Sequence, residues 1–226
     1  MYNLIKKIND NFNLTSTRLT STRIERKIKV YKYQTEFIKD NFYKIGFNNQ
    51  YPDQFIESIY FDDQYLNFAR SNINGELYRI KPRFRWYNDD LSKVNHEFKI
   101  KNGFNGYKSI NNHLYKNLKS KNEMILATKK FYREFLNISL NEVVSVRYLR
   151  TYLNHPSGIR ITVDRDIKAS LLKNNIYYAM PFEVIEFKYN NNLDSFFRNS
   201  IFNQLNRLPI RLTKCSKYVE SVIRLI

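Results

Sequence analysis

The 226-residue chain contains a single cysteine, Cys215, and no long apolar run. One cysteine excludes an intramolecular disulfide framework and a cysteine-based zinc site, and it favours a reducing compartment. The histidines His96, His113 and His155 stand in unrelated settings and give no zinc site either. No apolar stretch approaches the roughly 20 residues of a membrane-spanning helix, and Met1–Asn13 lacks the apolar core of a secretory signal. We therefore expect a soluble, cytoplasmic protein.

Acidic residues and linker-like segments are also scarce. The chain has 21 acidic side chains against 38 lysines and arginines, a formal net charge of +17. Such an excess predicts a polyanionic partner, which could be nucleic acid, an anionic membrane or a phosphate compound. No stretch rich in proline, glycine or serine marks a domain boundary, and 42% hydrophobic residues suffice for a packed core. We expect an irregular segment over residues 1–23, followed by one domain over residues 24–226.

The segment Tyr78–Tyr87 alternates cationic and apolar side chains. In a strand, successive side chains point to opposite faces, so one face would carry Arg79, Lys81, Arg83, Arg85 and Tyr87, and the other Tyr78, Ile80, Pro82, Phe84 and Trp86. Same-face neighbours lie roughly 7 Å apart, so four cations in a row repel one another unless an anion or bulk water relieves them. The row favours an anionic partner, with a solvated outer face as the alternative.

Other segments repeat this pattern of charged and apolar faces. Strands are predicted at Ile24–Val30, Ile56–Asp62, His96–Lys101, Val144–Tyr152, Gly158–Asp164 and Pro181–Lys188. Turns are predicted at Asn48–Asp53 and Asn88–Asn95, and helices at Gln34–Ile45, Lys119–Asn137, Leu193–Leu205 and in the C-terminal segment Lys217–Ile226. Closing such a sheet would place the charged faces inside. The predicted fold is α+β: an antiparallel β-barrel forming a basic tunnel, with helices packed outside and a C-terminal helix.

Seven short motifs, in this order, resemble a known family. They are Glu25–Ile28, Ser58–Asp62, Arg83–Tyr87, Glu97–Lys99, Ile161–Asp164, Val184–Lys188 and Cys215–Val219. Their order and spacing resemble the VTC domain, the polyphosphate polymerase domain of the vacuolar transporter chaperone family, in the triphosphate tunnel metalloenzyme superfamily. The resemblance covers Ile24–Ile226 and implies an antiparallel barrel that forms a tunnel.

The resemblance also implies site residues. The family's phosphate-binding cations fall on Lys27, Arg83, Arg85, Lys99, Arg150, Arg160 and Lys217, and its metal-holding carboxylate, for Mn²⁺ or Mg²⁺, on Glu186. Of these, Arg83, Arg85, Arg160, Lys217 and Glu186 are the expected catalytic residues. Arg147 competes with Arg150 for the inward position. Outside the resemblance, Glu186 could simply pair with Lys188, Glu25 and Glu97 could neutralise lysines, and Arg79 and Lys81 could set the field at the tunnel mouth.

The implied activity is transfer of the terminal phosphoryl group of a nucleoside triphosphate such as ATP onto a polyphosphate chain. The first strand carries Glu25, Lys27 and Lys29 on one face, fewer glutamates than the hydrolase branch of the superfamily, which favours the polymerase. A tunnel-type triphosphatase is the first alternative, and a non-catalytic module that binds polyphosphate or nucleic acid is the second. Nucleic acid is not the expected partner, and coupling to a membrane transporter would need another chain.

Overall fold

The computed structural model describes residues 2–11, 23–103, 105–111, 114–115, 117–172, 176–205 and 210–226. Its strands are β1 (Arg23–Val30), β2 (Asn48–Asp62), β3 (Tyr78–Tyr87), β4 (Asp90–Asn102), β5 (Asn105–Asn111), β6 (Asn141–Asn154), β7 (Arg160–Leu171), β8 (Tyr177–Ala179) and β9 (Glu183–Asn190). Its α-helices are α1 (Tyr2–Asn11), α2 (Lys32–Lys44), α3 (Asn67–Ile73), α4 (Lys121–Leu136), α5 (Asp194–Phe196) and α6 (Lys217–Leu225).

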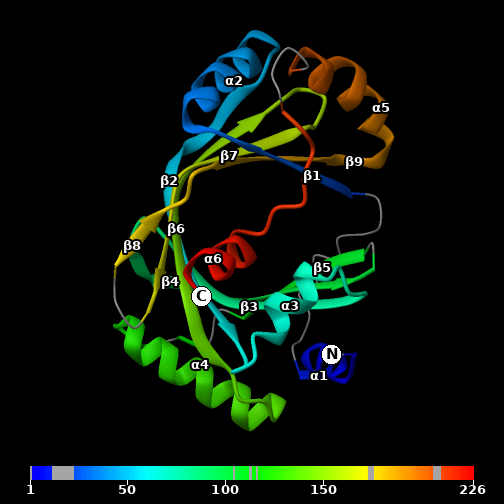
Figure 1. Ribbon diagram of the computed structural model, residues 1–226. Coiled ribbons are helices and arrows are strands. Elements are labelled where there is room, and N and C mark those ends of the chain that lie inside the picture. The colour runs from blue at the N-terminus through cyan, green and yellow to red at the C-terminus, as the bar shows by residue number, and fades with distance from the viewer. Residues whose placement is uncertain are drawn as a thin grey trace.

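The strands form one antiparallel sheet in the order β1-β9-β7-β6-β2-β3-β4-β5, with β8 paired to β7. Figure 1 shows this sheet curling into a half-barrel, with β7, β9 and β1 in one arm and β3, β4 and β5 in the other. The predicted α+β tunnel architecture is confirmed. In the described residues, the edge strands β1 and β5 are not paired with each other, so backbone hydrogen bonds leave the ring open.

Local sequence signals place the ends of the helices. Helix α4 begins at a capping box, in which the Ser120 side chain accepts a hydrogen bond from Glu123 N at 3.2 Å and the Glu123 carboxylate accepts one from Ser120 N at 3.2 Å. Helix α2 ends before Gly46, whose φ of +95° is open to glycine and strained for other residues. Both helices lie where the sequence predicts them.

Two predicted turns are wrong in extent. Asn48–Asp53 belongs to β2, because register shifts between Asn49 and Tyr51 and between Tyr51 and Gln54 accommodate Pro52, which has no N–H to donate. The segment Asn88–Asn95 is mostly strand β4. Only Asn88 and Asp89 form the hairpin turn, and both have the positive φ that a two-residue turn of this kind requires.

Four further elements differ from the predictions. Residues 2–11, expected to be irregular, form helix α1, and Arg23 begins β1, while residue 1 and residues 12–22 lie outside the described residues. Strands β5 and β8 were not predicted. The predicted helix Leu193–Leu205 is helical but irregular: α5 is followed by a π-helical segment, Phe197–Phe202, and flanked by 3-10 turns at Asn191–Leu193 and Asn203–Leu205.

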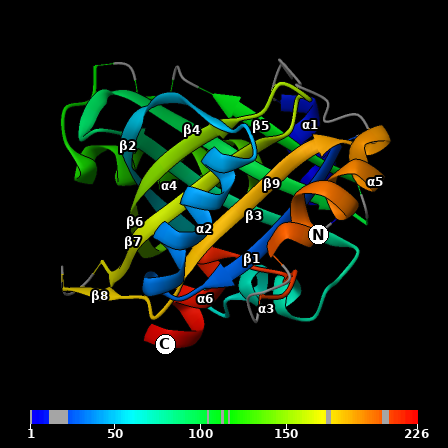
Figure 2. The ribbon, with the colours of Figure 1, turned by 90° about the horizontal axis from the view of Figure 1, so that it is seen from above.

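Helices cover the outer face of the sheet in two places and the inner face in one. One core packs β3 and β4 against α4 and α1, and a second packs β1, β7 and β9 against α2 and the segment after α5. Figure 2 shows α2 and α5 lying over the second of these regions. A third core packs α6 against β6, β7 and β9, and Figure 1 shows α6 inside the curve of the sheet. The inner face is therefore divided between an apolar part under α6 and a charged part beside it.

A buried carboxylate fixes α6 in this position. Asp62 at the end of β2 accepts hydrogen bonds from Phe68 N and Ala69 N, both at 2.9 Å, and from the Tyr218 hydroxyl of α6. Burial raises the pKa of Asp62 despite these donors. One side chain thus holds the start of α3 and the inner helix together.

We expect Tyr218→Phe to lower the free energy of unfolding by about 1.5–3 kcal/mol, because it removes a hydrogen bond to a buried carboxylate. Urea unfolding at neutral pH measures the change. Tyr43→Phe is the matched control, because it removes a hydroxyl that bonds Asn49 at an exposed site, and it should change stability by less than about 0.5 kcal/mol. Equal losses in the two variants would contradict the anchoring role of Asp62.

Candidate active site

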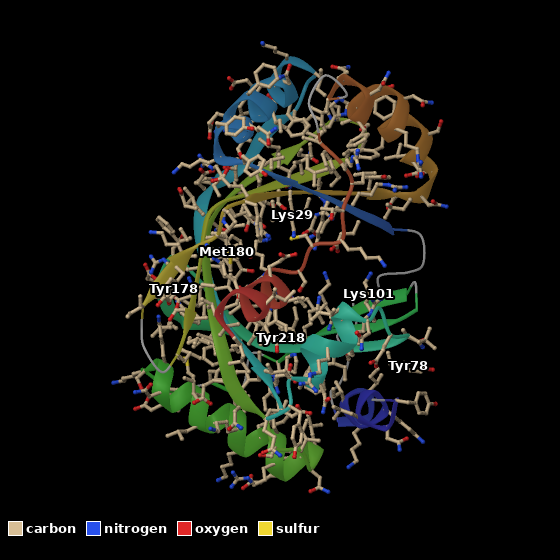
Figure 3. The ribbon with its side chains drawn as sticks, viewed as in Figure 1. Lys29, Tyr78, Lys101, Tyr178, Met180 and Tyr218 are labelled. Carbon is tan, nitrogen blue, oxygen red and sulfur yellow. The ribbon has the colours of Figure 1, made fainter. Side chains whose placement is uncertain are left out.

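Charged side chains gather on the inner face beside α6. We call the inner ring the set Glu25, Lys27, Arg83, Arg85, Glu97, Lys99, Lys108, Arg150, Asp164, Glu186 and Lys217, which comes from β1, β3, β4, β5, β6, β7, β9 and the start of α6. Their strand neighbours, such as Ile28, Phe84 and Ile185, are buried in the outer cores. Figure 3 shows Lys29 of β1 and Lys101 of β4 on the two facing arms of the sheet. The predicted alternation of faces is confirmed on these strands.

The first cluster of the ring spans the open side of the half-barrel. Lys27 Nζ lies 3.0 Å from Glu25 Oε1 and 3.4 Å from Glu186 Oε2, and Lys188 Nζ lies 2.5 Å from Glu186 Oε1. Lys99 Nζ of β4 lies 3.2 Å from Glu25 Oε1 of β1. Because β1 is one edge of the sheet and β4 is next to the other, this ion pair links the two arms. Side chains close the ring where the backbone does not.

Charge sets the protonation of this cluster. Burial alone would raise the pKa of Glu186, but Lys27 and Lys188 hold it well below its usual range. The pKa of Glu25 is likewise lowered, against the effect of burial, chiefly by Lys99. Both carboxylates are therefore ionised and bound to ammonium groups at neutral pH.

The second cluster centres on Asp164 of β7. Arg150 Nε donates to Asp164 Oδ1 at 2.6 Å, Arg150 Nη2 donates to Oδ2 at 2.8 Å, and Lys217 Nζ donates to Oδ2 as well. Lys217 Nζ also lies 4.6 Å from the centre of the Tyr148 ring. Burial would raise the pKa of Asp164, yet Arg150 and Lys217 lower it to about 2. The start of α6 is thus tied to the sheet through a fully buried carboxylate.

The third cluster joins β2, β3, β4 and β5. Arg83 Nε donates to Glu97 Oε2 at 2.7 Å, Arg83 Nη1 donates to the Tyr60 hydroxyl at 2.9 Å, and Lys108 Nζ lies 2.5 Å from Glu97 Oε1. The pKa of Glu97 is low because these cations, with Arg85, outweigh the effect of burial. Glu97 therefore neutralises neighbouring cations, which is the alternative that the sequence offered for this residue.

Arg85 has no carboxylate partner among the described residues. Its guanidinium donates to Ser58 Oγ at 2.9 Å and to the Tyr148 hydroxyl at 3.2 Å, and the side chain is only 7% exposed. Burial and the neighbouring cation Arg83 disfavour the charge of Arg85, whereas Glu97, with which it forms no ion pair, favours it. A buried cation whose hydrogen bonds go only to hydroxyl groups is costly unless an anion joins it. Arg85 is therefore the residue of the ring that most needs an anionic ligand.

The structure brings most of the predicted site residues together. Lys27, Lys99 and Glu186 share the first cluster, while Arg150 and Lys217 share the second. Arg83 and Arg85 lie side by side on β3 and, with Lys217, lower the pKa of Tyr60 against the effect of its burial. The roles of these residues in phosphate binding stay predictions.

Two arginines need separate comment. Arg160, at the start of β7, is exposed, stands in register with Lys188 and forms no ion pair with any residue in the described part of the chain. Arg150 faces the inner ring, whereas Arg147 lies 2.9 Å from Asp89 and 3.8 Å from Glu57 on the outer side. The register shift between Arg147 and Leu149 separates their directions.

Several ring members were missed at the sequence level. Lys108 lies on β5, where Gly103 and Gly106 were interpreted as an end to strand structure. The alternation of side chains around Lys108 could have predicted this strand, since Ser109 and Lys108 face opposite sides. The ring member Asp164, and Tyr60 beside the ring, share a strand face with predicted polar positions, but nothing in their spacing showed that they would bind arginines.

The inner ring supplies only some of the ligands that a divalent metal needs. In the described ranges, no group of three or more histidine, cysteine or acidic side chains is placed to hold a metal ion. Glu25 and Glu186 nevertheless lie within 3.4 Å of the same ammonium, that of Lys27. Mg²⁺ is commonly bound by one or two carboxylates together with substrate phosphates. The residues present therefore fit a metal that arrives with a phosphate ligand, and not one held by the protein alone.

The curled antiparallel sheet is similar in fold to solved structures of other proteins. The putative adenylyl cyclase HpAC1 from Hippeastrum, described as having a dominant triphosphatase activity, has this fold, with a TM-score of 0.57, 10% identity and coverage of 90% of this chain and 97% of that one. A putative adenylate cyclase from Vibrio parahaemolyticus has a TM-score of 0.52, 10% identity and coverage of 88% and 98%.

The chain belongs to the VTC-domain family, whose model matches residues 12–226. The predicted resemblance is confirmed. No curated protein matches the chain. Among the helices in the described residues, none has the length and apolar character needed to cross a bilayer.

Proposed function

We propose that this chain is a polyphosphate polymerase, which transfers the terminal phosphoryl group of a nucleoside triphosphate, with ATP as the expected donor, onto the end of a polyphosphate chain. The observation that carries the proposal is the buried Arg85, which has hydroxyl but no carboxylate partners, within a ring of cations in a VTC-domain protein. Arginine forks bind phosphate oxygens in pairs, and lysines add point charges. Such a ring would hold a triphosphate and an acceptor in line.

The protonation of the ring supports transfer rather than hydrolysis. Phosphoryl transfer requires mainly positioning and neutralisation of charge. A hydrolase must also activate water, and a general base works best with a pKa near the working pH. The ring carboxylates Glu25, Glu97, Asp164 and Glu186 all have pKa values lowered by their cation partners. They are poor proton acceptors, whereas an ionised phosphate acceptor needs no base.

A divalent metal completes the proposal. Glu186, with Glu25 beside it, would hold Mg²⁺ or Mn²⁺, since hard oxygen ligands suit these ions. When bound, the metal would neutralise charge on the phosphate oxygens. The chain's own contribution is to orient the phosphates through Arg83, Arg85 and Lys217.

The test is synthesis of polymer. Purified protein is incubated with ATP, Mn²⁺ or Mg²⁺ and a short phosphate primer, and the products are separated on a gel. Long polyphosphate is expected. Release of orthophosphate alone would replace the proposal with a tunnel-type triphosphatase. Tight, salt-sensitive binding without turnover would replace it with a binding module.

Lys99 makes phosphate binding sensitive to pH. Burial, with the repulsion of Lys27, lowers the pKa of Lys99 to about 8. The charged groups that face it are Glu25 and Lys27 on β1, Glu186 and Lys188 on β9, Lys81 on β3 and Lys108 on β5. An anion binds the protonated ammonium, so affinity is full below this pKa and falls as the pH rises through about 8.

We expect the affinity for long-chain polyphosphate, measured at constant salt without nucleotide, to fall several-fold between about pH 7 and about pH 9. Lys99→Arg is the matched variant, because arginine keeps its charge over this range. It should flatten the profile near pH 8 while every other titrating group is left in place. An affinity that does not change with pH in the unmodified protein, or the same profile in both proteins, would contradict the role of Lys99.

A further inference from the structure

Cations stand directly opposite cations on β3, β4 and β5. In the register of the sheet, Arg79 is opposite Lys101, Lys81 is opposite Lys99, and Lys99 is opposite Lys108. Residues directly opposite in an antiparallel pair share a face and place their Cβ atoms about 4.5–5.5 Å apart, so like charges there are destabilising. The arm of the half-barrel formed by β3, β4 and β5 thus carries an unusual concentration of positive charge.

Three of these cations form no ion pair with a carboxylate in the described residues: Arg79, Lys81 and Lys101. Lys99 and Lys108, by contrast, are paired with Glu25 and Glu97 of the inner ring. The Lys81 ammonium donates a hydrogen bond to Ser216 Oγ at 2.9 Å. The buried Nε of Arg79 has no hydrogen-bond partner within the described part of the chain. Lys101 forms no ion pair with any described residue.

The electrostatics of the cluster agree with its geometry. Burial lowers the pKa of Lys81 well below its ordinary value, and Lys99, Lys27, Lys101 and Arg79 lower it further. The pKa of Lys101 is also lowered, by burial and by cations that include Arg79, although Glu25 opposes the shift. The fold does not require these charges, because the packing of the arm rests on Ile80, Ile100 and their neighbours on the opposite face.

We propose that Arg79, Lys81 and Lys101 form a second anion site, which holds a segment of the polyphosphate chain beyond the units bound by the inner ring. This inference rests on the proposed function. Linear polyphosphate carries negative charge at every unit, which suits cations spaced about 5 Å across strands and about 7 Å along them. The site is continuous with the ring, because Lys81 is opposite Lys99 and bonds Ser216, the residue before Lys217.

The surroundings favour polyphosphate over nucleic acid. Single-stranded nucleic acids are commonly held by aromatic side chains on which bases stack. Of the aromatic residues of β3, Phe84 and Trp86 are buried in the outer core on the opposite face, and Tyr78 packs against the same core. Tyr87 is on the face of Arg79 and Lys81 but stands at the far end of the strand, where it packs against the core under α6. The cluster therefore offers charge without a stacking surface. Its effect on the reaction would be to retain a growing chain between transfers.

The experiment measures binding without nucleotide, with tripolyphosphate and long-chain polyphosphate as the two ligands. The triple variant Arg79→Gln, Lys81→Gln, Lys101→Gln should bind long-chain polyphosphate at least about tenfold more weakly and tripolyphosphate within about threefold of the unmodified protein. The affinity of the triple variant for long-chain polyphosphate should fall less steeply with salt concentration, since fewer cations bind phosphate. Its melting temperature should equal or exceed that of the unmodified protein, because repulsion between facing cations is removed.

The matched control removes three exposed lysines elsewhere: Lys32→Gln, Lys93→Gln, Lys130→Gln. An equal loss in this control would overturn the site in favour of a general field effect. A second variant, Arg79→Lys with Lys101→Arg, keeps the charge and should keep the tighter binding of long chains; loss of that preference there would also overturn the proposal. So would an equal loss for tripolyphosphate in the triple variant, which would assign its residues to the inner ring.

A single-stranded RNA of equal charge that competes as well as long-chain polyphosphate would overturn the assignment of the ligand.

Two outcomes separate this inference from the proposed function. If the unmodified protein makes no polymer from ATP but prefers long chains, and the triple variant loses that preference, the second site stands and the polymerase fails. If polymer forms and the triple variant binds long chains normally, the polymerase stands and the second site fails.

Discussion

Glu186→Gln is expected to abolish phosphoryl transfer while polyphosphate still binds. Glutamine keeps the size of the side chain but removes the charge that would hold a divalent metal. It also releases Lys27 and Lys188, which are 3.4 Å and 2.5 Å from the Glu186 carboxylate, from their ion pairs with it. We expect turnover to fall at least about a thousandfold, which corresponds to about 4 kcal/mol. Affinity for polyphosphate should be equal or higher, because two ammonium groups become available to phosphate.

The measurement needs both readouts on the same preparation: polymer formed per unit time, and binding of polyphosphate without nucleotide. Glu134→Gln is the control, because it makes the same chemical change at an exposed ion pair on α4. It should leave both readouts within about twofold. Retained turnover in Glu186→Gln would refute the metal role of this residue. Loss of both turnover and binding would instead indicate that Glu186 holds the ring together.

The alternation of side chains made much of this site predictable. A strand that buries Ile80, Phe84 and Trp86 against helices must direct Arg83 and Arg85 to the other side, whatever the rest of the chain does. The same reasoning placed Lys27 and Glu186 on inner faces. Local information suffices here because the period of a strand is two and one face is strongly apolar.

Partners at long range could not be predicted in the same way. Lys99 meets Glu25, 74 residues earlier in the chain, and Lys217 meets Asp164, 53 residues earlier. The amphipathic pattern of α6 shows that one side is apolar, but it does not show that this side packs on the inner face of the sheet rather than the outer. The choice between Arg147 and Arg150 likewise depended on a register shift that spacing does not reveal.

These long-range pairs neutralise part of the ring's positive charge, and the carboxylates occupy positions that substrate phosphates would contest. Asp164 is the clearest case, because it is fully buried and its two partners, Arg150 and Lys217, are only 12% and 11% exposed. Breaking a buried ion pair by removing one partner is strongly destabilising. Asp164→Asn should therefore reduce the free energy of unfolding by about 3–5 kcal/mol at neutral pH.

The pH dependence of this effect has a definite sign. The pKa of Asp164 is lowered from 3.8 to about 2, so its contribution is present above the ordinary value and is lost as the pH falls through about 2. The stability difference between the unmodified protein and Asp164→Asn should shrink over that acid range. Asp89→Asn, at an exposed pair with Arg147, is the control and should cost less than about 0.5 kcal/mol.

A phosphate ligand should restore part of what Asp164→Asn loses. The substitution leaves Arg150 and Lys217 without their shared carboxylate, and tripolyphosphate can supply the missing negative charge. A ligand that binds only the folded state stabilises any variant, by about 2.7 kcal/mol at a hundredfold excess over its dissociation constant. At equal ligand concentration, the gain should be larger for Asp164→Asn than for the unmodified protein, because the freed cations bind phosphate more tightly. Equal gains in urea unfolding would show that Arg150 and Lys217 serve the fold and not the ligand.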